Sequence, residues 1–251
     1  MHLEFQDNIA IVTLQGGRAN AIDATFLQGL SGLLDTVAHS PARAVVLTGY
    51  DKFFSAGLAL PALIDLDRPT MTEFITRFHD AMVQVFALPL PVIAAINGHA
   101  IAGGCVLALQ ADVRVMAAGP YRIGLNEAQL GIGLPPVVTE PLRCQVPAAS
   151  LGPIALQGLL LLPDEALALG LVNQVVPQGD VVQVAMGVAR ERAQVGRPAY
   201  AQIKAALRRP AQDAMARQLH DQTEGWLDTW FSEPARTRLV EAVAKLQRKA
   251  S

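Results

Sequence analysis

The sequence predicts an α/β fold in which a layered core is followed by a helical C-terminal segment. Short, β-branched apolar runs alternate with segments whose apolar residues recur at helical spacing, which is typical of a sheet covered by helices on both faces. Two of the apolar runs end in glycine-containing turns that lead into helices. From about Ala199 onward the pattern is helical only. We therefore expect a core over residues 1–195 and a helical segment over residues 196–251.

The first expected elements are two strands and one helix. Ile9–Leu14 is short and rich in β-branched residues, which favours a strand. Asp23 is a good N-cap for a helix that extends to about Ala38, and the apolar face of this helix consists of Phe26, Leu30, Leu33, Leu34 and Val37. A second strand is expected at Ala44–Leu47, directly before the first glycine turn.

Prolines divide the middle of the chain. Residues 61–70 contain two prolines and two aspartates, so we expect a mobile loop there. Thr72 is expected to cap a helix that ends near Leu88, before two further prolines and the apolar strand Pro91–Ile96. The remaining core elements are expected to be a helix at Val106–Gln110, a strand at Val113–Met116, a helix that opens at Pro163–Ala166 and a strand at Val175–Val176.

The C-terminal segment is amphipathic. Pro210 and Pro234 predict breaks within it. Its apolar side chains recur at helical spacing, and they are Ile203, Leu207, Met215, Leu219, Trp226, Leu227, Trp230, Phe231, Leu239, Val243 and Leu246. Such a segment buries little surface alone, so we expect it to pack on the core or on a neighbouring subunit.

Composition and charge exclude several classes of protein. With a net charge of −2 and no basic cluster, the chain lacks the electrostatic footprint of a nucleic-acid-binding protein. Arg208–Arg209 and Lys245–Lys249 are interpreted as solvated helix faces. No apolar stretch is long enough to cross a membrane, and the N-terminus has no signal-peptide pattern. The two cysteines, Cys105 and Cys144, suit a reducing compartment, so we expect a soluble cytoplasmic protein.

Two glycine-rich turns carry the functional signal. Phe53–Leu58 reads Phe-Phe-Ser-Ala-Gly-Leu, and Ile96–Cys105 reads Ile-Asn-Gly-His-Ala-Ile-Ala-Gly-Gly-Cys. A strand, a glycine turn and a helix together aim unpaired backbone N–H groups into a cleft. Two such turns can supply two donors to one oxygen, which is the arrangement of an oxyanion hole and predicts chemistry on an acyl group. The alternative is that both are ordinary strand-to-helix turns.

Together with three further segments, these turns resemble the crotonase (enoyl-CoA hydratase/isomerase) superfamily over nearly the whole chain. The further segments are Arg18–Asp23, Ile123–Gly131 and Gly170–Pro177. The resemblance implies a spiral of ββα repeats, a helical tail that covers the acyl pocket, and assembly into trimers or hexamers. It also implies that the substrate is an acyl-CoA thioester, with coenzyme A entering as part of the substrate rather than as a cofactor.

The resemblance also assigns roles to single residues. The backbone N–H groups of Leu58 and Gly103 correspond to the oxyanion donors. Arg18 corresponds to a position near the CoA phosphates and Ala56 to one near the adenine, and the full set of expected substrate contacts is Arg18, Ala56, Leu60 and Gly104. A surface role for Arg18 and a packing role for Leu60 are the alternatives.

Glu127 is the predicted catalytic residue. Its neighbours at 123–125 and 128–131 are apolar or neutral. A carboxylate in such surroundings loses solvation, so its pKa rises and it becomes a better base. The position also matches the family's second catalytic glutamate. A solvated surface glutamate is the alternative interpretation.

Two departures from the family pattern bear on the reaction. Enoyl-CoA hydratases carry a first glutamate just after the Gly-Gly-Cys turn, where this chain has Val106. Valine can neither hold nor activate water, which disfavours hydration by two carboxylates and favours a proton shuttle on Glu127, as in the Δ3,Δ2-enoyl-CoA isomerases of this family. Ala59 replaces an aspartate that usually supports the first turn, without removing the backbone donor.

The sequence therefore predicts an enoyl-CoA isomerase of β-oxidation, which shifts a double bond from 3-enoyl-CoA to 2-enoyl-CoA. Enoyl-CoA hydratase, or another crotonase-type reaction on a CoA thioester, is the alternative within the family. A non-catalytic acyl-CoA-binding protein is the alternative from another class.

Other side chains fit other chemistries poorly. Cys105 and Ser55 lack the flanking patterns of cysteine and serine nucleophiles. His99 is near the second turn, where a packing role is favoured over a place in the pocket. The pairs His79–Asp80 and His220–Asp221 are interpreted as surface polar residues. No metal-ligand spacing or phosphate-binding loop is present in the sequence.

Overall fold

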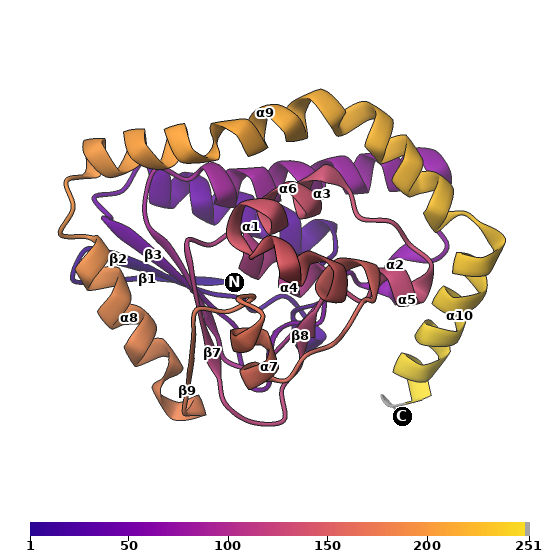
Figure 1. The fold of residues 1–251 in the computed structure, drawn as a ribbon, viewed down its shortest axis with the longest axis horizontal. Helices are drawn as coiled ribbons and strands as arrows, with labels where there is room; N and C mark the ends of the chain where they lie inside the picture. The colour runs from indigo at the N-terminus through magenta and orange to yellow at the C-terminus, as the bar shows by residue number, and fades with distance from the viewer. Residues whose placement is uncertain (249–251) are drawn as a thin grey trace.

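The computed structural model describes residues 1–248 and contains two β-sheets (Figure 1). The larger sheet has the strand order β1-β2-β3-β5-β7-β9, with β1 at His2–Gln6, β2 at Ile9–Thr13, β3 at Ala44–Thr48, β5 at Val92–Ile96, β7 at Val113–Ala117 and β9 at Gln174–Val176. The smaller sheet has the order β4-β6-β8, with β4 at Phe53–Ser55, β6 at His99–Ile101 and β8 at Ile123–Gly124. Only the β1–β2 pair is antiparallel among the pairings of these strands.

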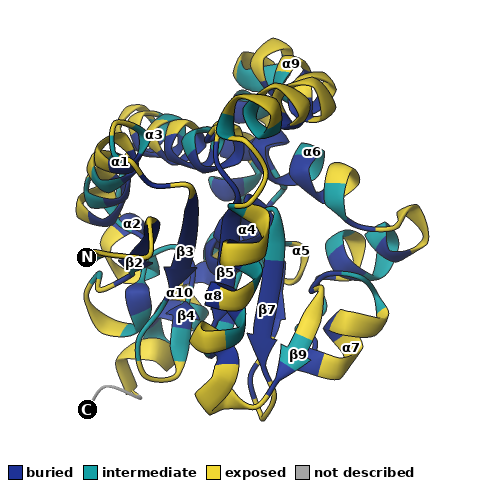
Figure 2. Cartoon of the chain, turned by 90° about the vertical axis from the view of Figure 1, so that its left-hand side faces the viewer, coloured by how far each residue is buried: buried dark blue, intermediate teal, exposed yellow. Residues whose placement is uncertain are grey.

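Successive strands alternate between the two sheets. β3, β5 and β7 lie in the larger sheet, and each is followed by a strand of the smaller one, β4, β6 and β8. Each repeat therefore adds one strand to each sheet, which confirms the spiral of ββα repeats that the family resemblance implied. All residues of β3 and β5 are buried, because helices cover the larger sheet, as Figure 2 shows for the dark central strands.

Ten α-helices are present in the described part of the chain. They are α1 Ala24–Ala38, α2 Leu60–Leu63, α3 Arg68–Ala87, α4 Gly103–Leu109, α5 Glu127–Leu130, α6 Pro136–Gln145, α7 Pro163–Ala168, α8 Val181–Arg192, α9 Arg197–Trp230 and α10 Glu233–Arg248. Helix α8 packs on β3, β5 and β7, whereas α9 lies across α3 and α6 (Figure 1). Short 3₁₀ turns and a π-helical turn at Gly152–Leu156 connect the other elements.

The expected strands and the first helix are confirmed. Helix α1 covers the predicted range, and its N-cap is Asp23, whose Oδ1 accepts a hydrogen bond from the N–H of Phe26 at 2.7 Å. Strands β2, β3, β5, β7 and β9 match the runs that predicted them to within one residue at either end. Strand β1, helix α6 and helix α8 were not predicted, because their apolar residues are too few or too irregular to show a clear period.

The expected loop at 61–70 is wrong. Helix α2 occupies its beginning, and α3 starts at Arg68 rather than after Thr72. The N-cap of α3 is Asp67, whose Oδ1 accepts from the N–H of Thr70 at 3.0 Å. Both prolines of this region lie in the first turn of a helix. At such a position the missing N–H of proline has no intrahelical partner to lose, so proline marks a helix start here and not a loop.

The expected break at Pro210 is also wrong, because α9 continues through it. Arg208 and Ala211, on either side of the proline, are buried, and contacts with the core hold the helix in line. The break near Pro234 is confirmed: α9 ends at Trp230, and the proline lies in the first turn of α10.

Two side chains assigned to the surface are buried instead. Arg208 is 6% exposed and its guanidinium lies 2.8 Å from a carboxylate oxygen of Asp112, whereas Arg209 is exposed as expected. His79 is 7% exposed within α3. Both were misplaced because a polar residue type was given more weight than its helix face. His220 and Asp221 are exposed, and Lys249 lies outside the described residues.

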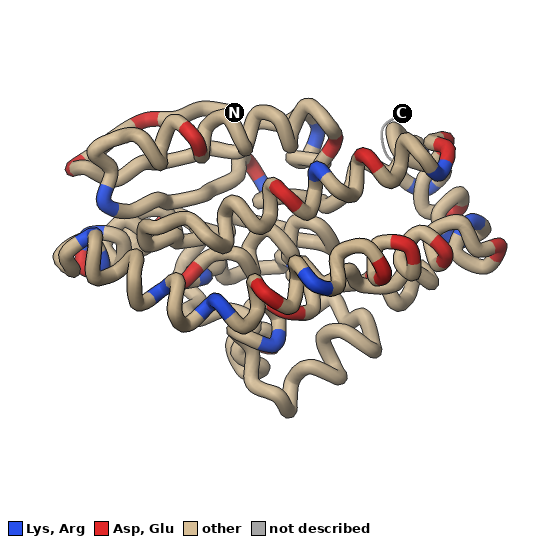
Figure 3. Tube along the Cα trace, turned by 90° about the horizontal axis from the view of Figure 1, so that it is seen from above, with Lys and Arg blue, Asp and Glu red and all other residues tan. Residues whose placement is uncertain are grey.

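Charge is distributed without a basic face in the view of Figure 3, where Lys and Arg alternate with Asp and Glu along the helices. This agrees with the small net charge. Within residues 1–248, no helix combines the length and apolar character needed to cross a membrane.

Candidate active site

The first glycine turn connects β4 to α2. Gly57 has φ +86°, a conformation that L side chains rarely adopt. Its N–H donates to Ser55 Oγ at 3.1 Å, and that hydroxyl donates to the carbonyl of Asn20 at 2.7 Å. The turn is thus fixed to the early segment Arg18–Asp23, which the sequence had linked to it only through the family resemblance.

Two backbone hydrogen bonds orient the next residue. The N–H of Ile22 donates to the carbonyl of Gly57 at 2.8 Å, and the N–H of Ala59 donates to the carbonyl of Ile22 at 3.0 Å. In this parallel bridge the N–H of Leu58 points away from Ile22, and no group within residues 1–248 accepts a hydrogen bond from it. This N–H is available to a ligand.

The second turn connects β6 to α4 and meets the first. Ala102 has φ +49°, and α4 starts at the next residue. A Cβ atom on Gly103 would lie 3.5 Å from the nitrogen of Leu58 and 3.4 Å from the Cα of Gly57. The N–H of Gly103 also has no acceptor among the described residues. The chain therefore brings two unpaired backbone donors to one place, as two turns of this kind predicted.

Gly104 lies where the second turn packs against the backbone of the first turn at Ser55. A Cβ atom there would lie only 2.2 Å from the carbonyl oxygen of Ser55. Because that oxygen belongs to backbone, the clash could not be relieved by a side-chain movement, so any other residue would push the two turns apart.

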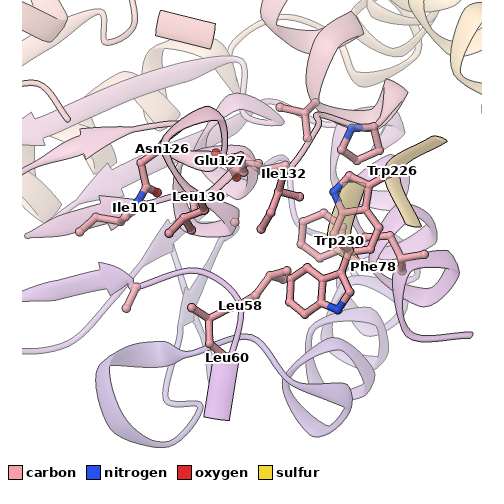
Figure 4. A pocket seen from close by; sticks show the side chains of 17 residues that line it. Leu58, Leu60, Phe78, Ile101, Asn126, Glu127, Leu130, Ile132, Trp226 and Trp230 are labelled. Atoms are coloured by element: carbon pink, nitrogen blue, oxygen red, sulfur yellow. The ribbon is translucent and has the colours of Figure 1, made fainter. Parts of the chain in front are cut away.

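A pocket of about 100 Å³ opens next to these turns (Figure 4). Its walls come from both turns, α3, α4, the segment 126–138 and the end of α9. They are Ala56, Leu58, Leu60, Ile75, Phe78, Ile101, Ala102, Gly103, Val106, Asn126, Glu127, Leu130, Ile132, Pro135, Val138, Trp226 and Trp230. Apart from Glu127, none of these residues has a side chain that ionises at ordinary pH.

Glu127 is the first residue of α5, a single turn that ends at Gly131 with φ +79°. Its carbonyl accepts from the N–H of Ile132 at 3.0 Å, which closes the turn. The Oε2 atom is inaccessible to solvent and has no hydrogen-bond partner among the described residues. Burial raises the pKa of Glu127 to about 7, so near neutral pH this carboxyl group can both accept and donate a proton.

The C-terminal segment forms one wall of the pocket. Trp226 and Trp230 stack with ring centroids 5.2 Å apart at the end of α9. Thr229, between them, accepts from the N–H of Gly133 at 2.9 Å and so connects α9 to the chain just beyond α5. Helix α10 packs on α2 and α5. The segment thus packs on its own core, one of the two arrangements that the sequence left open.

The predicted site residues divide into two groups. Ala56, Leu58, Leu60, Gly103 and Glu127 line the pocket, as does Val106. Gly104 lies behind the second turn, and Arg18 is exposed and does not line this pocket.

Two further candidates are placed outside the pocket wall. His99 packs between Phe53 and Tyr121, with ring centroids 5.2 and 5.5 Å away. Cys105 is fully buried, and burial raises the pKa of its thiol above the ordinary range, so the thiol is protonated at neutral pH and is a poor nucleophile.

Sequence reasoning missed Asn126 and Phe78. Asn126 precedes Glu127, and its Oδ1 is buried without a partner in the described part of the chain. Phe78 belongs to the buried face of α3, where its spacing reads as core. Neither residue has a signal that separates a pocket wall from ordinary packing.

Comparisons with known proteins agree with this geometry. The family described as enoyl-CoA hydratase/isomerase matches residues 4–241. A carnitinyl-CoA dehydratase of Salmonella typhi is 34% identical over 194 residues, which are 76% of this chain and 73% of that protein. Human mitochondrial Δ3-Δ2-enoyl-CoA isomerase has the same fold with a TM-score of 0.94, covering 100% of this chain and 99% of its own at 26% identity. A protein of Mycobacterium tuberculosis is described as an enoyl-CoA isomerase in one solved structure and as a probable enoyl-CoA hydratase in another. These give TM-scores of 0.83 and 0.82 over 89% of this chain, and 97% and 93% of their own, also at 26% identity.

The spiral of ββα repeats and the two meeting glycine turns are those of a crotonase-type enzyme of acyl-CoA thioesters. With a family match over almost its full length, this chain belongs to the enoyl-CoA hydratase/isomerase family.

Proposed function

We propose that this protein is a Δ3,Δ2-enoyl-CoA isomerase in which Glu127 is the only acid–base group. The observation that carries the proposal is the composition of the pocket: one carboxyl group among apolar walls. A double-bond shift needs one proton to leave C2 and one to arrive at C4. A single group with a pKa of about 7 can perform both transfers.

The mechanism follows from the positions of the donors and the base. The thioester oxygen of 3-enoyl-CoA accepts hydrogen bonds from the N–H groups of Leu58 and Gly103. Glu127 removes a proton from C2, and the electrons of that C–H bond form a dienolate whose negative charge lies on the thioester oxygen. The two N–H groups stabilise this charge. The dienolate then takes the same proton from Glu127 at C4, which yields 2-enoyl-CoA and restores the carboxylate.

Hydration by two carboxylates requires a second carboxylate, and Glu127 supplies the only one in the described lining of the pocket. Val106 is 1% exposed and lines the pocket where, by the family resemblance, hydratases carry their first glutamate. Without that carboxylate, a water molecule has no pair of groups to position it. The apolar walls also keep bulk water from quenching the dienolate.

The relatives carry more than one reaction name, so the reaction needs a direct test. A similar structure that covers all of this chain is an isomerase, whereas curated relatives at 34% identity are dehydratases. Elimination of water from a 3-hydroxyacyl-CoA, or hydration of a 2-enoyl-CoA, by Glu127 alone is the competing function within the family.

The deciding experiment supplies trans-3-hexenoyl-CoA and, separately, trans-2-hexenoyl-CoA to the purified protein and follows the products by liquid chromatography. We expect rapid conversion of the 3-enoyl to the 2-enoyl thioester and hydration at least about a hundredfold slower, since a positioned acid–base group contributes about that much. Faster hydration than isomerisation would overturn the proposal. Binding without either reaction would indicate a non-catalytic acyl-CoA-binding protein.

The proposal includes three expectations about the surroundings of the reaction. The acyl-CoA thioester is the sole small-molecule partner, with no separate cofactor or metal ion. The chain works in the cytoplasm as a homotrimer or a hexamer. Exposed apolar side chains on α9, Ile203 at 53% and Leu207 at 72%, lie one turn apart and support an assembly contact there. Sedimentation velocity of the purified protein tests this, and a monomer at micromolar concentration would contradict it.

A further inference from the structure

We propose that the acyl pocket accepts chains of up to about six carbons, because the stacked pair Trp226 and Trp230 closes its far end. This inference rests on the proposed function only in taking the pocket to hold the acyl group of a CoA thioester. It concerns binding, so it is tested without turnover.

The pocket has two ends, which Figure 4 shows on opposite sides. Ile101 and Asn126 lie at one end, near the second glycine turn, and Trp226, Trp230 and Phe78 lie at the other. Glu127, Leu130 and Ile132 lie between them. A thioester oxygen at the N–H groups of Leu58 and Gly103 therefore directs its acyl chain past Glu127 toward the two indole rings.

The volume of the pocket sets the number of carbons. An apolar cavity of about 150 Å³ holds a benzene ring, so a pocket of about 100 Å³ accommodates roughly four carbons beyond the thioester carbonyl. With the carbonyl carbon this gives an acyl group of about five carbons, and the longest even-numbered chain within one carbon of that length has six. A longer chain has to displace the indole wall.

Burial, ring stacking and hydrogen bonds hold Trp226 and Trp230 in place. Trp230 is fully buried and Trp226 is 5% exposed. Their rings stack, and the hydroxyl of Thr229 donates to the carbonyl of Trp226 at 2.7 Å while it accepts from the N–H of Gly133. Leu227, next to the pair, is fully buried on another side of α9 and does not line the pocket. Moving either indole would therefore disturb the packing of the whole helix end.

The first test measures binding of saturated thioesters, which cannot react. Isothermal titration of the full chain with acetyl-, butanoyl-, hexanoyl-, octanoyl- and decanoyl-CoA gives a Kd for each. We expect Kd to fall about fourfold per buried methylene up to hexanoyl-CoA and then to level off or rise. A fall that continues to decanoyl-CoA would overturn the inference, as would equal Kd values from acetyl- to hexanoyl-CoA.

The second test moves the wall. In Trp230→Leu we expect the break in the Kd series to shift from hexanoyl-CoA to octanoyl-CoA or beyond. Leu227→Ala is the matched control, because it removes buried volume from the same helix end without touching the pocket, and its break should stay at hexanoyl-CoA. A shift in both variants, or in neither, would contradict the role of Trp230. If Trp230→Leu does not fold, the wild-type series alone decides.

The two proposals fail in different ways. A protein that does not isomerise 3-hexenoyl-CoA but shows the break at hexanoyl-CoA refutes the proposed reaction and leaves the length limit standing. A protein that isomerises long and short chains equally refutes the length limit alone.

Discussion

Two carboxylates of low solvent exposure in this protein have opposite surroundings. Asp112 follows α4 and lies beneath α9, where one oxygen is 2.8 Å from Lys204 Nζ and the other 2.8 Å from the guanidinium of Arg208. It also accepts from the N–H of Val92 at 2.7 Å. Glu127, in the pocket, has an Oε2 with no partner within the described chain. We call the cluster of Asp112, Lys204 and Arg208 the charged anchor.

The difference separates a carboxylate that holds two cationic side chains of α9 in place from the carboxylate that we propose as the base. In the charged anchor, partners replace the lost hydration, and the charges connect the N-terminal half of α9 to the core. Lys204 donates to the carbonyl of Leu90 at 2.9 Å, and the Arg208 guanidinium lies 4.1 Å from the ring centroid of Phe86. Glu127 has no such compensation, so its carboxyl group stays protonated to a higher pH and remains able to exchange its proton with a substrate.

The largest expected effect is on activity. Glu127→Gln keeps the size and polarity of the side chain but removes the proton-accepting group, so isomerase kcat should fall by at least about 10³-fold. Steady-state assays with 3-hexenoyl-CoA measure this. The Kd for hexanoyl-CoA should change by less than about threefold, since an uncharged side chain still fills the same place. Activity within tenfold of wild type would show that the bare carboxylate is not the base.

The charged anchor gives the largest expected effect on stability. Asp112→Asn leaves Lys204 and Arg208 facing each other without their counter-charge, and breaking a buried ion pair costs about 3–5 kcal/mol in the free energy of unfolding. Urea denaturation measures it. Asp213→Asn is the control: this carboxylate is 54% exposed and 3.9 Å from Arg209 on the same helix, so its loss should cost less than about 0.5 kcal/mol. Equal effects of the two variants would mean that the anchor contributes no more than a surface pair.

A smaller change in the free energy of unfolding, of opposite sign, is expected for Glu127→Gln. The pKa of Glu127 is raised from 4.5 to about 7 in the folded protein, so between these values the folded state binds more protons than the unfolded state. Stability should therefore fall as pH rises from about 4.5 to 7. Glu127→Gln lacks this ionisation, and at pH 8 it should be more stable than wild type by on the order of 3 kcal/mol.

The pH dependence itself is the check on that prediction. Urea denaturation of wild type and Glu127→Gln at pH 4.5 should give nearly equal free energies of unfolding, with the gap opening toward pH 8. A constant gap at all pH values would assign the difference to packing instead of ionisation.

The same two carboxylates show what sequence reasoning could and could not supply. Glu127 was singled out because its sequence neighbours are apolar, and burial raises its pKa in the direction that these neighbours predicted. The charged anchor was missed because its partners are 92 residues apart or more along the chain. Arg208 next to Arg209 looks like a solvated face, and only the docking of α9 reveals that one arginine points inward.

The fold shows the same division between features encoded locally in the sequence and features that depend on distant contacts. The strands of the larger sheet other than β1 are apolar runs, the first helix has a clear period and the N-cap Asp23, and these elements were predicted closely. The strands of the smaller sheet, with two or three residues each, are too short to show a period and were not predicted. The spiral came from the family resemblance, because strand order depends on contacts that periodicity does not encode. In the site, the two turns and Glu127 could be predicted, whereas Asn126 and Phe78 could not, since lining a pocket is a property of the assembled walls.

The smallest expected effect concerns another unpaired polar group of the pocket lining, besides those of Glu127 and Asn126. The Nε1 of Trp230 is buried and has no acceptor among residues 1–248. An unsatisfied buried donor costs about 1–3 kcal/mol, so Trp230→Phe removes that cost while it loses part of the ring's packing. These two effects oppose each other, so the free energy of unfolding of Trp230→Phe should differ from that of wild type by less than about 1 kcal/mol. Trp230→Ala loses the packing of the whole ring and should cost about 3–5 kcal/mol. Thermal or urea denaturation compares the two. A loss in Trp230→Phe close to that of the alanine variant would mean that the indole N–H makes a stabilising interaction, and that the cost assigned here to an unpaired donor is wrong.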